Sequence, residues 1–162
     1  NAWRYNKDKA EALADLICES LPKKFDVMRV HVGGDYFSKT YLEAWVIVAH
    51  RNPEKVFYSY SKSLHLFSDV IRPENLVLTA SRGGKFDELI DQHGWKEAVV
   101  VYSEEEAAEK GLEIDHDDTH AAFGSENFAL LIHGTQPKGS AASQALSALL
   151  KKKKLASNPQ PV

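Results

Sequence analysis

The stretch Val27-Met-Arg-Val-His-Val-Gly-Gly-Asp35 decides how the chain is expected to fold. Its first six residues are mostly apolar and rich in valine, which predicts a strand over 27–32. The two glycines end that strand, and Asp35 follows at its carboxyl end. Apolar residues at helical spacing precede the stretch over 13–21 and follow it over 42–49, so the strand is expected between two helices.

The same alternation continues through the rest of the chain. Strands are predicted over 56–60, 76–79, 98–102 and 128–132, and helices over 64–71, 86–93, 104–110 and after Ser140. Five strands separated by helices imply right-handed crossovers and a mainly parallel five-stranded α/β sheet. An incomplete (partial) βα barrel and an open doubly wound sheet both satisfy this pattern.

Capping residues and apolar spacing also predict the helix boundaries and the limits of the domain. Thr40 is the expected N-cap of the helix that ends before Pro53, and Ser140 caps the last helix. That last helix is expected to bury one apolar stripe, formed by Ala142, Ala145, Leu146, Leu149 and Leu150. We expect a single α/β domain over 1–154 and a flexible C-terminal tail over 155–162.

Composition restricts the classes of protein to consider. The 162 residues are 43% hydrophobic with a formal net charge of −3, which is typical of one ordinary globular domain. Cys18 is the only cysteine, so the chain can form neither an internal disulfide nor a cysteine-rich zinc site. No stretch is apolar enough to span a membrane, and the expected location is the cytoplasm. The sequence begins without Met, which indicates that an N-terminal portion is missing or that the chain comes from a longer product.

In open or closed βα sheets, ligands bind beyond the carboxyl ends of the strands. Small, polar or charged residues stand at or near these ends, which predicts a site for a small polar or anionic ligand. The alternative is a set of ordinary turns and caps. The candidate ligand-binding residues at the first, second, third and fifth strand ends are Gly33, Gly34, Asp35, Ser59, Lys62, Ser81, Arg82 and His133.

The loop before the last helix adds Lys138, Gly139 and Ser140 to the candidate ligand-binding residues. Backbone N–H groups at a helix N-terminus with a lysine nearby favour an anion, although simple capping explains the same residues. The spacing is not that of a phosphate-binding Walker loop.

Two further segments have a candidate function. The segment 115–120 offers His116, Asp118 and His120, whose imidazole and carboxylate groups suit zinc, iron or manganese. An ordinary acidic loop is the alternative. The run Lys151–Lys154 is either a solvated helix end or a weak contact to nucleic acid.

Several motifs are similar to those of the phage "gene product 88" domain family. They are Arg29-Val-His-Val-Gly-Gly-Asp-Tyr-Phe-Ser38, Tyr41-Leu-Glu-Ala-Trp45, Asn52-Pro53, Phe57-Tyr-Ser-Tyr-Ser-Lys62 and Leu130-Leu-Ile-His-Gly-Thr-Gln-Pro-Lys-Gly-Ser140. The family in turn looks distantly similar to the radical S-adenosylmethionine (radical-SAM) enzyme barrel. In that barrel a Gly-Gly-Glu segment holds the amino group of the cofactor, and Gly33, Gly34 and Asp35 match this position.

The chain differs from the radical enzymes in the cysteines that would bind an iron–sulfur cluster. Those enzymes bind a [4Fe–4S] cluster through three neighbouring cysteines, and Cys18 alone cannot do so. S-adenosylmethionine and an iron–sulfur cluster are therefore expected only if a Cys-rich N-terminal segment is missing. The resemblance implies a phage protein in the host cytoplasm with an enzyme-like partial barrel that binds a small polar or nucleotide-derived ligand. The alternative is a non-catalytic binding module for a host protein or nucleic acid.

Overall fold

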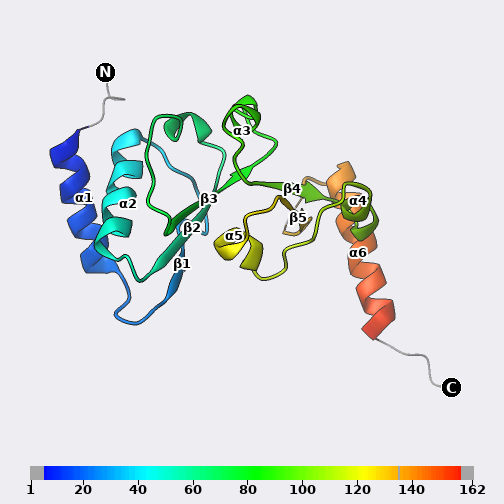
Figure 1. Cartoon of the computed structure of the whole chain (residues 1–162). Coiled ribbons are helices and arrows are strands. Elements are labelled where there is room, and N and C mark those ends of the chain that lie inside the picture. The colour runs from blue at the N-terminus through cyan, green and yellow to red at the C-terminus, as the bar shows by residue number, and fades with distance from the viewer. Residues whose placement is uncertain (1–5, 135, 158–162) are drawn as a thin grey trace.

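A computed structural model describes residues 6–134 and 136–157 and shows one five-stranded parallel sheet (Figure 1). The strands lie in chain order, with each one paired to the next, and the sheet curls into a half-barrel. A doubly wound sheet reverses its strand order partway, so that alternative is wrong for this chain. The strands are β1 (Val27–Arg29), β2 (Val56–Ser61), β3 (Leu76–Ser81), β4 (Glu97–Val101) and β5 (Phe128–Leu131).

The helices begin and end mostly where short polar residues and glycine favour it. Ser38, and not Thr40, is the N-cap of the second helix, and its hydroxyl accepts a hydrogen bond from the Tyr41 N–H at 3.1 Å. Gly94 ends the third helix in the left-handed conformation, which glycine adopts without strain. The helices are α1 (Lys7–Ser20), α2 (Lys39–Arg51), the 3₁₀ turn η1 (Leu64–Leu66), α3 (Glu88–His93), α4 (Glu104–Glu109), α5 (Thr119–Phe123) and α6 (Ala141–Ser157).

Helices cover the two faces of the sheet differently. On the convex face α2 packs over the first three strands, and α1 lies against α2 (Figure 1). Phe57, Leu76 and Leu78 point into this main core. On the concave face α5 contacts β2 and β3, and its alanines pack against Tyr58 and Phe128. The segment 112–125, which has no clear period in the sequence, therefore supplies the cover of the concave face.

The junction between β3 and β4 is short. Only two pairs of residues are in register there, Ala80 with Glu97 and Ser81 with Ala98. By comparison, β2 and β3 are in register at five positions. The beginning of β3 thus has no strand beside it on the β4 side, and the sheet consists of a β1–β3 section and a β4–β5 section.

The C-terminal helix differs from the expectation. None of its described residues is buried, so the predicted buried stripe is wrong: amphipathic spacing marks an apolar face but does not supply a partner for it. The helix continues through 155–157, where a tail was expected, while 158–162 lie outside the described residues. In the part of the chain that the structure describes, no helix is both long enough and apolar enough to cross a membrane.

Burial predicts opposite outcomes for two truncations. Phe57 is 0% exposed in the main core, so Phe57→Ala should lower the free energy of unfolding by about 3–5 kcal/mol. Leu150 of α6 is 56% exposed, and Leu150→Ala should change it by less than about 0.5 kcal/mol. Urea denaturation of both variants measures the difference. Equal losses would contradict the placement of α6 outside the core.

Candidate functional site

The carboxylate of Asp35 joins the loops that follow β1 and β2. Its Oδ1 atom accepts hydrogen bonds from the Ser61 hydroxyl at 2.6 Å and the Tyr36 N–H at 2.7 Å. Its Oδ2 atom accepts from the N–H groups of Lys62 at 2.7 Å and Ser63 at 3.1 Å. Four donors therefore occupy this carboxylate, and its position at the strand ends is fixed by them.

Lys62 extends this connection to the loop after β3. Its ammonium group donates to the carbonyls of Ser81 at 3.3 Å and Arg82 at 3.1 Å. The lysine side chain crosses Gly84 closely, because a Cβ atom there would lie 3.3 Å from the Lys62 Cβ atom. Three consecutive strand ends are thus held together, and we call Asp35, Lys62, Ser81 and Arg82 the rim cluster.

Arg82 of the rim cluster and the predicted residue Ser59 both have partners inside the protein. The Arg82 guanidinium donates to Glu97 and, at 2.9 Å, to Asp91, and these two carboxylates raise the pKa of Arg82. Ser59 is buried and accepts a hydrogen bond from the Tyr36 hydroxyl at 3.1 Å. Ser59 therefore lies in the main core on the convex face of the sheet and does not point toward the rim cluster.

His31 stands between the first strand and Gly33 in an unusual conformation. It has a φ of 71°, a left-handed value that residues other than glycine seldom adopt. Its Nε2 atom shares a hydrogen bond with the Tyr41 hydroxyl at 2.9 Å, and its buried Nδ1 atom has no hydrogen-bond partner. Burial lowers the pKa of His31, and the nearby Asp35 opposes this only in part.

The remaining predicted ligand-binding residues lie elsewhere. His133, Lys138, Gly139 and Ser140 follow β5, at the edge of the sheet opposite to β1. The Ser140 hydroxyl accepts a hydrogen bond from the Ser143 N–H at 3.1 Å and so caps α6, as the sequence predicts. No hydrogen bond among the described residues joins these four to the rim cluster.

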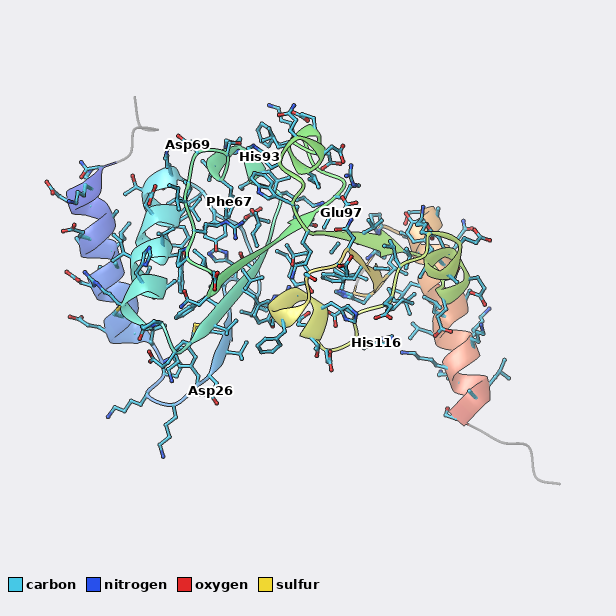
Figure 2. All side chains as sticks on the ribbon, in the orientation of Figure 1. Asp26, Phe67, Asp69, His93, Glu97 and His116 are labelled. Atoms are coloured by element: carbon cyan, nitrogen blue, oxygen red, sulfur yellow. The ribbon has the colours of Figure 1, made fainter. Side chains whose placement is uncertain are left out.

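The candidate metal ligands are not brought together. Asp118 points to the sheet, His120 shares a hydrogen bond with Glu113 at 2.8 Å, and His116 is exposed beside α5 (Figure 2). Over residues 6–134 and 136–157, no group of three His, Cys, Asp or Glu side chains could hold a metal ion.

Asp118 instead forms a cluster with three residues of the concave face. Its carboxylate accepts hydrogen bonds from the hydroxyls of Tyr58 at 2.8 Å and Tyr60 at 2.9 Å, and from the Arg29 guanidinium at 3.1 Å. Burial and the bond to Asp118 raise the pKa of Tyr58 to about 12. The sequence reading missed this cluster. The alternation of Tyr58 and Tyr60 along one strand face was its only signal.

The lowered pKa of His31 makes its contribution to stability depend on pH. The unfolded state binds the proton more readily, so stability is lost as pH falls below the ordinary histidine pKa of 6.5. His31→Asn tolerates the left-handed backbone and removes this titration. Urea denaturation at about pH 7.5 should show the variant less stable than the wild type, and at about pH 5 the gap should shrink. An equal gap at both values would contradict the lowered pKa.

Comparisons with known proteins complete the description. A family model described as "Gene product 88" matches residues 2–152. The "Gene 88 protein" of Mycobacterium phage L5 is 32% identical over 123 residues, an alignment that covers 74% of this chain and 44% of that relative. The chain therefore spans less than half the length of the curated relative. No solved structure matches the chain.

These comparisons do not support the distant similarity to radical S-adenosylmethionine enzymes. The family match, by contrast, covers nearly the whole chain and includes β1 to β5, the rim cluster and the Asp118 cluster. The chain belongs to the gene product 88 family of phage proteins.

Proposed function

We propose that this domain binds a small polar or anionic ligand at the carboxyl ends of β1, β2 and β3, with Lys62 as the charged anchor. The observation that carries the proposal is the setting of the Lys62 ammonium group. Two carbonyls hold it in place, and no carboxylate of the described residues lies within 4.0 Å of it. A positioned cation that no carboxylate contacts directly favours an anionic group in the ligand.

The loop around Gly33 and Gly34 gives the ligand room. A Cβ atom at either glycine would meet no atom within 4 Å, so the space above this loop is open. Gly34 has a φ of 83°, which a larger residue would adopt only with strain. The strained backbone of His31 lies next to it, and such strain tends to collect at functional sites. The proposed site therefore comprises Gly33, Gly34 and the rim cluster.

A ligand of the radical-enzyme type fits these residues poorly. An iron–sulfur cluster needs several thiolates, whereas Cys18, the single cysteine, lies half-buried in α1. Asp35 already accepts four hydrogen bonds and has little capacity left for the amine of a cofactor. The phosphate groups of a nucleotide suit the cationic Lys62 better. His133, Lys138, Gly139 and Ser140 are not included, because no hydrogen bond among the described residues joins them to the rim cluster.

Lys62→Met should weaken nucleotide binding if the proposal is right. Isothermal titration with adenosine triphosphate is expected to show saturable binding to the wild type and binding at least about tenfold weaker, or about 1.4 kcal/mol, for the variant. Lys85→Met is the matched control, since Lys85 is an exposed lysine of the neighbouring loop. No binding to the wild type, or equal weakening by both substitutions, would refute the role of Lys62.

One observation favours a second candidate function, a contact with nucleic acid through α6. Lys151, Lys152, Lys153 and Lys154 are all exposed on a helix that buries none of its described residues. Only Lys152 forms an ion pair within the described chain, with Glu105 at 3.2 Å. A run of exposed cations, most of them without an ion pair among the described residues, attracts phosphates in a salt-dependent way.

A gel-shift series separates this candidate from a merely solvated helix end. The double substitution Lys153→Gln and Lys154→Gln should weaken binding to a short double-stranded DNA at low salt and reduce its salt dependence. Lys23→Gln with Lys24→Gln removes the same charge from another exposed site and should have no effect. Unchanged mobility of the DNA with wild-type protein at low salt rules the candidate out.

A further inference from the structure

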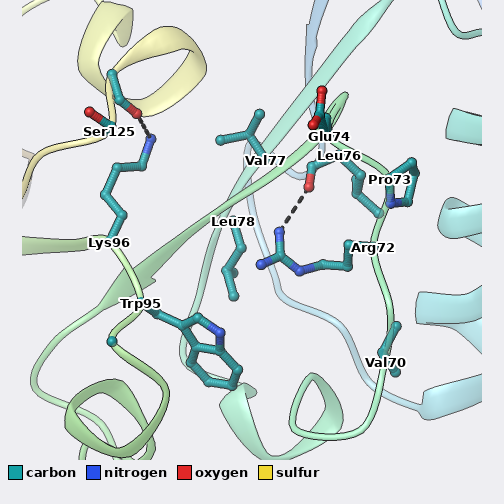
Figure 3. A pocket seen from close by; sticks show the side chains of 12 residues that line it. Val70, Arg72, Pro73, Glu74, Leu76, Val77, Leu78, Trp95, Lys96 and Ser125 are labelled. Carbon is teal, nitrogen blue, oxygen red and sulfur yellow. Dashed lines mark hydrogen bonds between the residues drawn. The ribbon is translucent and has the colours of Figure 1, made fainter.

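The short junction between β3 and β4 leaves a cavity at the amino ends of these strands. Its volume is about 390 Å³, and it lies beside Leu76, Val77 and Leu78, where β3 has no neighbouring strand on this side (Figure 3). The segment before β3 and the turn before β4 form its other walls. Pockets for small organic ligands have volumes from about 300 Å³ upward. The cavity is therefore large enough for a small molecule, and it lies at the opposite strand ends from the rim cluster.

Arg72 lines this cavity as a largely unsatisfied cation. Its Nη1 atom donates to the Leu76 carbonyl at 2.9 Å, and its guanidinium carbon lies 5.8 Å from the centre of the Phe67 ring. No carboxylate of the described residues lies within 4.0 Å of it. A guanidinium has five N–H donors, so most of those of Arg72 remain available. Burial lowers the pKa of Arg72, because the protein surroundings solvate the charged form less well than water does.

Lys96 adds a second positive charge to the same cavity. Its ammonium group donates to the carbonyls of His120, Ala121 and Gly124, each at 2.8 Å, and these bonds use all three of its donors. Lys96 therefore contributes electrostatic attraction and no direct contact. The acidic side chain among the lining residues is Glu74, which is exposed and pairs with neither cation. Burial lowers the pKa of Lys96, and the nearby Asp115 opposes this only in part.

Trp95 supplies an apolar wall opposite the guanidinium (Figure 3). Its ring stacks on His93 with centroids 4.3 Å apart and meets Phe67 edge-on at 6.5 Å. These contacts hold the indole in a fixed orientation. A ligand with an oxyanion at one end and an apolar or aromatic body at the other matches the cation and this wall.

We propose that this cavity is a second binding site of the protein, which takes a small organic carboxylate or phosphate with Arg72 as the bidentate anchor and Trp95 as the wall. The proposal is independent of the ligand at Lys62, because the two sites share no residue. It rests on the pairing of an accessible cavity with a half-buried arginine that has no acidic partner. The ligand neutralises a charge that the fold leaves without compensation.

Titration of the full chain with benzoate, phenyl phosphate and inorganic phosphate tests the proposal. Binding is followed by calorimetry and by the indole N–H resonance of Trp95 in ¹⁵N spectra. We expect saturable binding of benzoate or phenyl phosphate, with a shift of the Trp95 resonance and weaker binding of inorganic phosphate. The two organic probes distinguish a carboxylate site from a phosphate site, and either result supports the proposal.

Three variants locate the binding. Arg72→Lys keeps the charge but loses the forked geometry and should weaken binding at least about tenfold. Glu74→Gln removes the negative charge at the cavity without touching the core and should strengthen binding about two- to fivefold. Lys62→Met should leave this site unchanged, which separates it from the rim cluster. The proposal is overturned by an absence of saturable binding, by chloride binding equally well, or by an Arg72→Lys variant with wild-type affinity.

Discussion

The carboxylate of Asp118 holds the two sections of the sheet together. It belongs to the segment between β4 and β5, yet its three partners, Arg29, Tyr58 and Tyr60, belong to β1 and β2. The strand pairing between the sections amounts to two residue pairs, so side chains must carry much of the connection. Hydrogen bonds to a charged acceptor contribute about 1.5–3 kcal/mol each, less where solvent reaches them. Lys96 completes the arrangement by binding the other end of α5 to the start of β4.

Internal hydrogen bonds also explain the carboxyl ends of β1 to β3, where the sequence predicts a ligand site. In the sequence Asp35 looks like a free carboxylate at a strand end. In the structure it accepts hydrogen bonds from the backbone N–H groups of Lys62 and Ser63, in the loop that follows β2. The Asp35 carboxylate therefore fixes the loops, whereas the Lys62 ammonium group contacts two carbonyls and no carboxylate of the described residues. The matching sequence of two glycines and an acidic residue does not show whether the carboxylate binds a ligand or the protein's own loops. The acid can hold a ligand in one protein and a loop in another.

How much the sequence could predict depends on whether the cause of a feature is local. The apolar runs of β2 and β4 and the cap at Ser140 depend on near neighbours and were predicted correctly. The strand order could be read only from the structure, because a partial barrel and a doubly wound sheet have the same alternation of strands and helices along the chain. α5 is five residues long and depends on contacts with β2 and β3, which no local pattern encodes. Arg72, a lone arginine before a proline, belongs to no motif.

Charge compensation separates the groups that stabilise this fold from those that fit a ligand. Arg29 has Asp118, Arg82 has Asp91 and Glu97, and in each case the protein itself neutralises the cation. Arg72 has only a carbonyl and the edge of an aromatic cluster, although its charge is partly removed from water. Removing a charge from solvent costs several kcal/mol unless an opposite charge or a full set of hydrogen bonds replaces the water. The hydrogen bond to Leu76 and the contact with Phe67 offset only part of that cost, and an oxyanion in the cavity would offset more of it.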